Sequence, residues 1–574
     1  MSLEPPASAP SNEEGEESHN GERGAVLLGA GSPWGRLLAE SLARRDFSLL
    51  LVDSAGDDLE RTREQVVSLG ASAEVLTPSY AEVPLLLQTA RQVPSGFPAV
   101  ELLVHALPPP VTGAFTEREP ESIAVEANRG FSSLVVFARQ FLPGMIEQGE
   151  GRLIVLGSAA ARAPLAKAAV HSALAMALPP FLTALEREVF RQGVRISYLE
   201  PAGHPSPPID EEVAGGPTPL HESHRRFLVS DASVVRAFEH VLDRPRVRRW
   251  RFHSHARAPP APQVLRRYTE RELHGRHPEV HRRAEAPSSV PADALRGGTA
   301  VVTGSSRGIG RQIALRLASH GMRVVLTGRD VPALEKVAKE VQKAGGEARV
   351  LAQDLLAAGA AARLFAFTQE TWGIPRILVN NAGIGFFRRL VRQDDRQLTL
   401  QLGVDLLAVL SVTRAFLPAM LEQGGGQVLN VGSLAPEVPL PRLAAYSGIK
   451  GAVKGLTLAL GREVSPRGTN VSVLEPTTVN TEFLETAKEP GRRDLREMGA
   501  MRYIMIGPEE VGRVAERTVL RPRPVAYVPP RMAPLLWMYR ALGPLADRSL
   551  RLAPPSSGGA RGEKVERTPT KPEP

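Results

Sequence analysis

The chain has 574 residues, a formal net charge of +8 and no cysteine. These features exclude a single small domain, a disulfide framework and any cysteine-ligated metal centre. The positive charge comes from one segment, because residues 244–283 hold twelve arginines and three glutamates. The rest of the chain therefore has a formal net charge of −1. The near neutrality of that remainder disfavours a nucleic-acid groove on a folded domain. No run approaches 18 apolar residues, and the N-terminus is acidic, so we expect a cytoplasmic protein.

An internal repeat organises the chain. Residues of the first half recur in the second at a constant separation of 275 positions, as in Gly29 and Gly304, Gly35 and Gly310, Arg187-Glu-Val and Arg462-Glu-Val, and Leu199-Glu-Pro and Leu474-Glu-Pro. A register kept over such a distance indicates tandem duplication, so the two halves should share one fold.

We predict six segments in chain order. They are a disordered acidic N-terminus at 1–23, a first domain at 24–252, a linker rich in Pro, Arg and His at 253–297, a second domain at 298–530, an amphipathic helix at 531–551 and a disordered tail at 552–574. The helix at 531–551 carries Leu535, Met538 and Tyr539 at helical spacing. Peripheral membrane contact and packing on protein both stay open for it.

Short apolar runs alternate with longer helical patterns in the second half. Strands are predicted at 300–303, 323–327, 377–380, 427–431 and 470–474. Strands that are apolar on both faces and joined by helical crossovers form doubly wound parallel sheets. The repeat extends this to the first half, and the predicted fold is α/β with two tandem Rossmann-type domains.

A glycine-rich turn follows the first of these strands. The run Thr303-Gly-Ser-Ser-Arg-Gly-Ile-Gly310 opens a helical pattern. Glycines there permit a tight turn and close approach of the backbone to a pyrophosphate, which the N–H groups of a helix N-terminus bind. The residues expected to contact a dinucleotide in this loop are Gly304, Ser306, Arg307, Gly308, Ile309 and Gly310.

Further motifs, in their order and spacing, resemble the classical short-chain dehydrogenase/reductase family. They are Asn380-Asn-Ala-Gly383, Ser433 thirteen residues before Tyr446, Tyr446-Ser-Gly-Ile-Lys450, and Pro476 followed by Thr481. The resemblance implies an NAD(P)-dependent oxidoreductase that interconverts a carbonyl and a secondary alcohol. It also implies cofactor contacts from Asn381, Ala382, Gly383, Tyr446, Lys450 and Thr481, with Asp354 at the adenine.

Tyr446 and Lys450 are the expected proton-transfer pair. Residues i and i+4 share one face of a helix, so the ammonium of Lys450 can lie near the Tyr446 hydroxyl. A phenol titrates near about 10, and a nearby cation favours its phenolate. Proton exchange with a substrate oxygen then becomes feasible. The resemblance implies that Ser433 hydrogen-bonds that oxygen and positions it.

Two further positions bear on the details of the site. Asp405 stands where the family commonly has Asn, and a carboxylate cannot donate as an amide can, so the role of this position stays open. The end of the second strand reads Thr327-Gly-Arg329, where NAD enzymes place an acid. Arg329 and Arg307 can pair with a phosphate. We therefore expect NADP(H) to be preferred, with NAD(H) as the alternative.

The first half has lost this chemistry. At the separation of 275, Tyr446 corresponds to His171, Lys450 to Ala175 and Gly308 to Pro33. Asp53 still stands near the acid position of an NAD-type strand, so residual nucleotide binding stays open. We expect this degenerate domain to pack on the intact one as an intramolecular pseudo-dimer, in a chain that can also form homo-oligomers.

The substrate is expected to be a small carbonyl or alcohol compound, and no metal or nucleic acid is expected. Apolar residues in the variable loops point to a lipophilic substrate, although core packing explains them equally well: Phe386, Phe387, Phe483, Met498, Met501 and Ile504. The alternative function is a catalytically silent scaffold or dinucleotide-binding protein.

Overall fold

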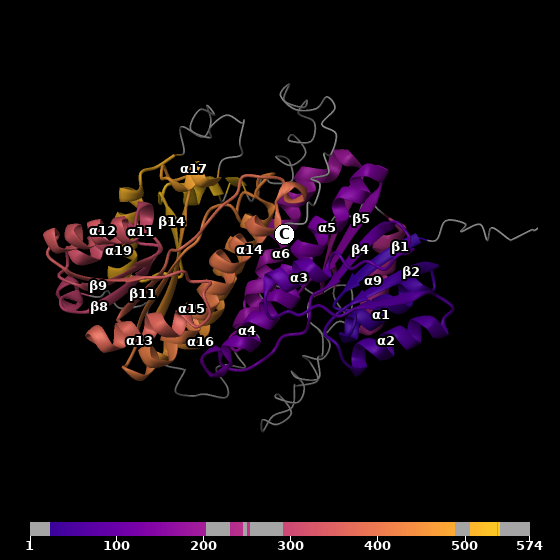
Figure 1. Cartoon of the computed structure of the whole chain (residues 1–574), viewed down its shortest axis with the longest axis horizontal. Coiled ribbons are helices and arrows are strands. Elements are labelled where there is room, and N and C mark those ends of the chain that lie inside the picture. Colours follow the sequence, from indigo (N-terminus) through magenta and orange to yellow (C-terminus); the bar gives the residue numbers. More distant parts are fainter. Residues whose placement is uncertain are drawn as a thin grey trace, which may run out of the picture.

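The computed structural model describes residues 23–201, 230–244, 249–252, 291–487, 505–536 and 538–539. These residues form two seven-stranded sheets, one in each half of the chain (Figure 1). The strand orders are β3-β2-β1-β4-β5-β6-β7 and β10-β9-β8-β11-β12-β13-β14, and the strands pair in parallel. Both sheets are doubly wound, with the order reversing at β1/β4 and β8/β11. The predicted pair of Rossmann-type α/β domains is confirmed.

The elements of the first half lie within residues 23–252. Its strands are β1 (Arg23–Leu28), β2 (Phe47–Val52), β3 (Ala73–Leu76), β4 (Val100–Ala106), β5 (Gly151–Leu156), β6 (Val194–Pro201) and β7 (Arg249–Phe252). Its helices are α1 (Pro33–Ala43), α2 (Asp57–Ser68), α3 (Val83–Thr89), α4 (Pro120–Ala127), α5 (Ser133–Gln148), α6 (Ala169–Val189) and α9 (Asp231–Asp243).

The second half repeats this order. Its strands are β8 (Thr299–Thr303), β9 (Arg323–Gly328), β10 (Glu347–Ala352), β11 (Ile377–Asn380), β12 (Gly426–Val431), β13 (Thr469–Pro476) and β14 (Val525–Val528). Its helices are α11 (Gly308–Ala318), α12 (Val331–Lys343), α13 (Ala360–Trp372), α14 (Asp395–Leu402), α15 (Ala408–Glu422), α16 (Ala444–Val464), α17 (Phe483–Ala487) and α19 (Pro508–Leu520). All five strands predicted in this half are present.

Each half interrupts one long helix with a single π-helical turn. The turns are Asn128–Ser132, between α4 and α5, and Gly403–Leu407, between α14 and α15. They occupy equivalent positions in the repeat. The second turn carries Asp405, so the unusual residue of this half sits where the helix is wound more widely.

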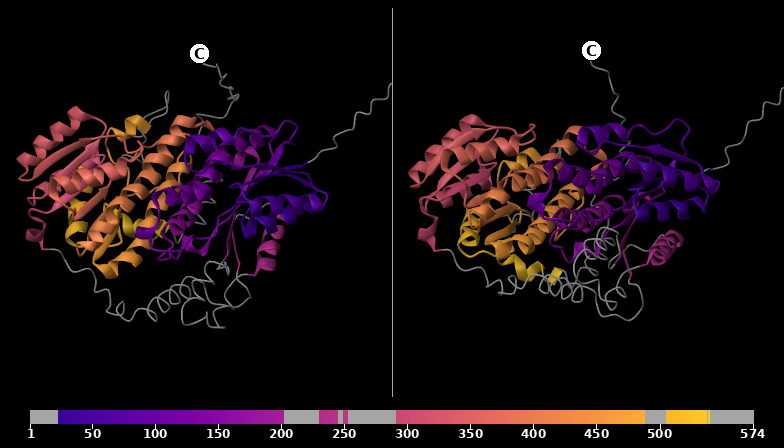
Figure 2. Two further views of the ribbon diagram at one scale, coloured as in Figure 1. Left: turned by 60° about the horizontal axis from the view of Figure 1, so that its bottom comes forward. Right: turned by 90° about the horizontal axis from the view of Figure 1, so that it is seen from below.

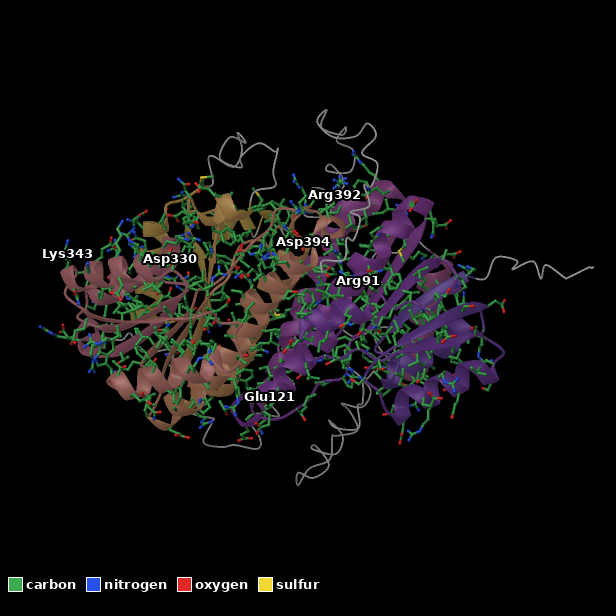
Figure 3. The ribbon with its side chains drawn as sticks, in the orientation of Figure 1. Arg91, Glu121, Asp330, Lys343, Arg392 and Asp394 are labelled. Atoms are coloured by element: carbon green, nitrogen blue, oxygen red, sulfur yellow. The ribbon has the colours of Figure 1, made fainter. Side chains whose placement is uncertain are left out.

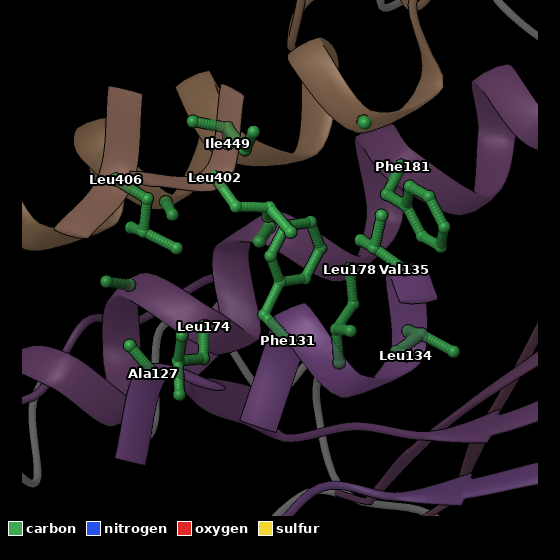
Figure 4. Close-up of a cluster of buried hydrophobic side chains, with 14 of the residues drawn as sticks. Ala127, Phe131, Leu134, Val135, Leu174, Leu178, Phe181, Leu402, Leu406 and Ile449 are labelled. Atoms are coloured by element: carbon green, nitrogen blue, oxygen red, sulfur yellow. The ribbon is translucent and has the colours of Figure 1, made fainter. Parts of the chain in front are cut away.

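The two halves share one hydrophobic core. A continuous cluster of buried side chains includes Phe131 and Phe181 of the first half together with Leu402, Leu406 and Ile449 of the second (Figure 4). Because apolar surface from both halves is removed from water at once, the junction is part of the folded core. Figures 1 and 2 show the two sheets on either side of a central layer of helices.

Helices α16 and α6 form the centre of this layer and run antiparallel. A Cβ built on Gly455 would lie 2.7 Å from the Ser172 carbonyl oxygen, and one on Gly451 would lie 2.8 Å from that of Met176. A Cβ on Gly448 would lie 2.5 Å from the Phe131 ring. Glycines therefore let α6 approach the backbone of the helix that carries Tyr446 and Lys450.

The junction has the pattern of a two-fold interface. Arg139 Nε donates to the carbonyl oxygen of Gln393 at 2.8 Å. Arg414 Nε donates to that of Arg118 at 2.6 Å. Donors and acceptors in these two bonds are both 275 positions apart. The same surface is used by each half toward the other, as in an isologous dimer, so the chain folds as an intramolecular pseudo-dimer.

Two helical stretches of the described residues have the length and apolarity of a membrane span, Ala169–Gln192 and Asp395–Glu422. Their apolar windows are 78% and 61% buried within the protein. Both lie in the central layer, so packing between the halves accounts for their composition.

The expected helix at 531–551 is described only as far as Tyr539. Leu535 and Met538 are each 49% exposed, whereas Leu536 is buried. The Tyr539 hydroxyl accepts a hydrogen bond from Arg187 of the first half at 3.1 Å. This part of the segment therefore contacts the other half of the chain. Arg23, the last residue of the segment predicted to be disordered, begins β1. The rest of that segment, the predicted disordered tail at 552–574 and most of the predicted linker at 253–297 lie outside the described residues.

Candidate functional site

Ser433, Tyr446 and Lys450 come together at the carboxyl end of β12 and the start of α16. The Tyr446 and Ser433 hydroxyls are hydrogen-bonded. Lys450 lies one turn along the helix, with its Nζ 5.6 Å from the centroid of the Tyr446 ring and 3.4 Å from the Val431 carbonyl oxygen. The three residues predicted to be catalytic therefore share one site.

Opposing effects act on the Tyr446 hydroxyl. Burial raises its pKa above the usual range, and the carboxylate of Asp405 adds to that. The ammonium of Lys450 and the hydrogen bond from Ser433 lower it. Burial lowers the pKa of Lys450, but the charges of Asp405 and Tyr446 and the hydrogen bond to Asp405 together raise it above its usual value, so the ammonium stays charged.

Asp405 is fully buried beside this group. Its Oδ1 lies 2.8 Å from the Lys450 Nζ, and its Oδ2 accepts the backbone N–H of Ile384 at 2.8 Å. Burial raises the pKa of Asp405, and Lys450 acts against that rise. A Cβ built on Gly383 would lie 2.8 Å from Oδ1. Asp405 thus ties Lys450 to the turn that follows β11.

The Asn380-Asn-Ala-Gly383 segment is held by side-chain amides. Asn381 Nδ2 donates to the carbonyl oxygens of Thr303 and Gly304 at 2.9 and 3.0 Å. Asn380 Nδ2 donates to Thr413 Oγ1 at 2.9 Å. These bonds fix the end of β11 against the glycine turn, and a Cβ on Gly304 would lie 2.7 Å from the Ala382 Cα.

The glycine turn leaves room at the N-terminus of α11. Gly304 and Gly308 have φ of +62° and +54°, in the left-handed region. A Cβ on Gly310 would lie 2.4 Å from the Gly304 carbonyl oxygen. The side chain of the N-cap residue, Arg307, makes no capping hydrogen bond to the first turn of α11. An N-terminus that its own N-cap side chain does not cap suits a bound pyrophosphate.

A cavity of about 660 Å³ opens beside this helix end. It is lined by residues that include Ser306, Arg307, Gly308, Asp330, Lys336 and Thr481. Its volume and its cations fit the adenosine phosphate side of a dinucleotide. Arg329 and Asp354 are exposed at the ends of β9 and β10 and do not line it.

Asp330 and Lys336 are among the lining residues of this cavity that sequence reasoning missed. Asp330 follows Arg329 directly and caps α12, accepting the Ala333 N–H at 3.1 Å. Figure 3 places it in the second half, far from the junction marked by Arg91 and Asp394. Lys336 lies on the same helix and lines the cavity. An acidic residue, Asp330, therefore lies just beyond the end of β9, where the sequence analysis found no acid. Lys336 lines the same cavity.

The matching turn of the first half is closed. Ser32 caps α1 by accepting the Gly35 N–H at 3.0 Å, and Pro33 occupies its first turn without an N–H. Asp53 is 1% exposed and pairs with Arg129 through two bonds of 2.7 and 2.8 Å. It also accepts the Gly31 N–H at 2.9 Å. The carboxylate oxygens of Asp53, which would bind a ribose in an NAD site, instead accept hydrogen bonds from Arg129 and Gly31.

The counterparts of Tyr446 and Lys450 are also changed. His171 is 5% exposed, and burial lowers its pKa to about 4. Ala175 stands one turn later, where the second half has Lys450. A histidine held neutral without a neighbouring cation lacks the electrostatics of the Tyr446 site.

Aromatic residues lie near Tyr446. The Phe483 ring centroid lies 6.1 Å from that of Tyr446, and a Cβ on Gly385 would lie 2.4 Å from the Phe483 ring. Phe386 and Phe387 are half-buried on the same loop. Met498, Met501 and Ile504 lie outside the described residues.

Comparison with known proteins covers both halves. The family model described as short chain dehydrogenase matches residues 23–213 and 298–491. The probable oxidoreductase EphD of Mycobacterium tuberculosis is 32% identical over 260 residues, 43% of each chain, so the chain spans less than half the length of this relative. The 3-oxoacyl-[acyl-carrier-protein] reductase FabG of Pseudomonas aeruginosa is 32% identical over 201 residues, 35% of this chain and 81% of that protein.

Among solved structures, a metagenomic short-chain oxidoreductase in complex with NADP is 33% identical, covering 41% of this chain and 96% of its own, with a TM-score of 0.35. A short-chain dehydrogenase/reductase from Burkholderia phymatum in complex with NAD is 24% identical, covering 44% and 96%, with a TM-score of 0.40.

Proposed function

Since the chain belongs to the short-chain dehydrogenase family, we propose that its second half is an NADP(H)-dependent oxidoreductase that interconverts a carbonyl and a secondary alcohol. One observation carries the proposal. The hydrogen-bonded hydroxyls of Tyr446 and Ser433 meet the ammonium of Lys450 in the half whose glycine turn is open.

Each side chain has a role that follows from its chemistry. Ser433 donates to the substrate oxygen and fixes its position. In reduction Tyr446 gives its proton to that oxygen, and in oxidation its phenolate takes the proton from the alcohol. Lys450 stabilises the phenolate through its charge. The bound nicotinamide supplies the hydride or accepts it.

The preference for NADP(H) rests on cations around the cavity. Arg307 and Lys336 line it, and Gly328 stands at the position that Asp53 occupies in the first half. Asp330, Glu482 and Glu485 also line the cavity and are the opposing charges. Installing the acid by Gly328→Asp should shift the ratio of kcat/KM for NADPH over NADH downward by about tenfold or more, since a carboxylate repels the 2′-phosphate. A ratio unchanged by this variant would contradict the assignment.

The substrate proposed is a lipophilic carbonyl compound. Phe483 beside Tyr446 supports this, as do the half-buried Phe386 and Phe387.

The proposed location is the cytoplasm. Peripheral membrane contact through 531–551 is supported by the exposed Leu535 and Met538, and sedimentation with vesicles tests it. Assembly into homo-oligomers is tested by light scattering.

The first half is proposed to be a non-catalytic partner domain. The shared core and the α6–α16 contact support this. A fragment of residues 298–574 should lose both stability and turnover, because half of that core would face water. A fragment as stable and as active as the full chain would refute the role.

The direct test is NADPH oxidation by the full chain with ketones, aldehydes, steroids and 3-oxoacyl thioesters. Tyr446→Phe should lower turnover by about a hundredfold or more while NADPH binding is kept. His171→Phe alters the equivalent residue of the first half and should leave turnover unchanged. If none of these compounds is turned over, the alternative of a catalytically silent scaffold is favoured.

A further inference from the structure

A carboxylate of the first half bonds to the backbone of the second. Glu188, in the last turn of α6, accepts the Arg442 N–H at 2.7 Å through Oε1. It accepts the Leu390 N–H at 2.9 Å through Oε2. The side chain is buried, with 7% of the residue exposed. Both oxygens are therefore committed to the other half of the chain.

The two N–H groups belong to two separate segments, the loop after β11 and the approach to α16. Leu390 begins a short 3₁₀ turn in the loop after β11. Arg442 precedes Tyr446 by four residues and has a φ of +72°, so it turns the chain into α16. Arg442 Nη2 also donates to the Phe387 carbonyl oxygen at 3.3 Å. Glu188 thus joins the loop and the start of the catalytic helix.

The equivalent arrangement occurs a second time, related to the first by the pseudo-two-fold symmetry of the two halves. Glu463, in the last turn of α16, accepts the N–H groups of Phe115 at 2.7 Å and Lys167 at 3.1 Å. Each of these three residues is 275 positions from its counterpart. Lys167 also has a positive φ, of +58°. The two carboxylates make equivalent bonds, although Glu463 is half-buried and Glu188 is buried. The segments held by Glu463 lead to His171.

From this asymmetry we propose that Glu188 is a positioning residue that the first half supplies to the active site of the second. The proposal rests on the proposed function of the second half. The loop at Leu390 and the approach to Tyr446 are separate segments, and one carboxylate fixes the distance between them. Small displacements of substrate-holding segments have large effects on rate.

The substitution that tests this keeps the size of the side chain. A glutamine at 188 retains one carbonyl oxygen and turns an NH2 group toward a backbone N–H, so one of the two bonds is lost. Glu463→Gln makes the same change at the symmetry-equivalent position. A purely structural role for these residues would make the two variants equivalent.

The experiment compares both variants with the wild type as full chains. Both variants should still unfold cooperatively, which shows that each chain is folded. Only Glu188→Gln should lower kcat/KM for the carbonyl substrate, by about tenfold, the loss expected for one bond to a buried charge. The NADPH dissociation constant should stay within about twofold, since the glycine turn is remote. Equal kcat/KM in the two variants would overturn the proposal.

Amide hydrogen exchange supplies a readout that needs no substrate. Glu188→Gln should speed exchange in peptides covering 384–395 and 438–446, and Glu463→Gln in those covering 110–118 and 163–171. Unchanged exchange at 384–395 and 438–446 in Glu188→Gln would overturn the proposal even if turnover fell. If the wild type reduces no carbonyl, the proposed function fails, whereas the exchange result still decides whether Glu188 orders these segments.

Discussion

The carboxylate of Asp405 lies 2.8 Å from the ammonium of Lys450, and both groups are almost fully buried. The pair has no net charge, so Tyr446 experiences less positive potential than a lone lysine would give. Asp405 stands where the family commonly has an amide. The lysine is thus held in place by an ion pair, at some cost to the acidity of the tyrosine.

Asp405→Asn should move the pH dependence of turnover. Removing the anion leaves Lys450 free to favour the phenolate, so the limb of the profile that reports Tyr446 should shift to lower pH by roughly one unit. Turnover at the optimum should change by less than about tenfold, because Ser433, Tyr446 and Lys450 remain. The variant should also be less stable, since Lys450 stays buried without its partner.

The profile of kcat/KM against pH checks this prediction. Asp395→Asn is a matched control, since that carboxylate pairs with Arg139 at the junction and not with the site. An unmoved limb would contradict the effect assigned to Asp405. A rise in turnover of several orders of magnitude would mean that Asp405 cripples the site.

The full chain should bind one NADPH, not two. The oxygens of Asp53 are occupied by Arg129 and backbone N–H groups, and Ser32 caps the helix end that a pyrophosphate would need. Gly310→Ala and Gly35→Ala introduce the same methyl group in the two turns, at 2.4 and 2.0 Å from a glycine carbonyl oxygen. Calorimetric titration should show that only Gly310→Ala lowers NADPH affinity. A stoichiometry of two would contradict the closure of the first half.

The glycines of α16 give a prediction about stability. A methyl group at Gly455 would lie 2.7 Å from the Ser172 carbonyl oxygen, whereas one at Gly461 would find its nearest neighbour at 3.8 Å. Gly455→Ala should therefore lower the free energy of unfolding by about 1–3 kcal/mol through overpacking. Gly461→Ala should raise it by up to about 1 kcal/mol through helix propensity. Denaturant unfolding measures both, and equal effects would mean that α6 does not pack against Gly455.

Much of the fold was accessible from the sequence because its signals are local. Apolar runs predicted the five strands, and the i, i+4 spacing of Tyr446 and Lys450 placed both on one helix face. The glycine turn followed from residues adjacent in the chain. The repeat then carried the fold to the first half.

The remaining features depend on contacts between distant segments. Glu188 meets Leu390 and Arg442 across separations of 202 and 254 residues, and no local pattern encodes such a pairing. The conserved register of Arg187-Glu-Val with Arg462-Glu-Val was the available signal, since two equivalent glutamates can form a symmetric contact. The ion pair of Asp405 with Lys450 could not be predicted from the sequence for the same reason, since it joins the π-helical turn to α16.

Glu188 should make stability depend on pH. Burial raises its pKa to about 7 against an ordinary value of 4.5, and the backbone N–H groups and Arg389 oppose the rise. Between these values the folded chain binds the proton more tightly than the unfolded chain does. The free energy of unfolding should therefore fall as pH rises through this window, with up to about 3 kcal/mol from this group.

Glu188→Gln isolates that contribution. The variant has no proton to release, so its stability curve should lack this fall. Unfolding in urea at several values between pH 4.5 and 7 measures the difference. Parallel curves would show that Glu188 does not titrate in this range.

The central claim is that one half of the chain carries a working nicotinamide site and the other does not. A crystal structure of the full chain grown with NADP⁺ tests it most directly. The account predicts a dinucleotide with its pyrophosphate at the N-terminus of α11 and its nicotinamide beside Tyr446, and none at Ser32 and Pro33. A dinucleotide in the first half, or a nicotinamide out of reach of the Tyr446 hydroxyl, would contradict it.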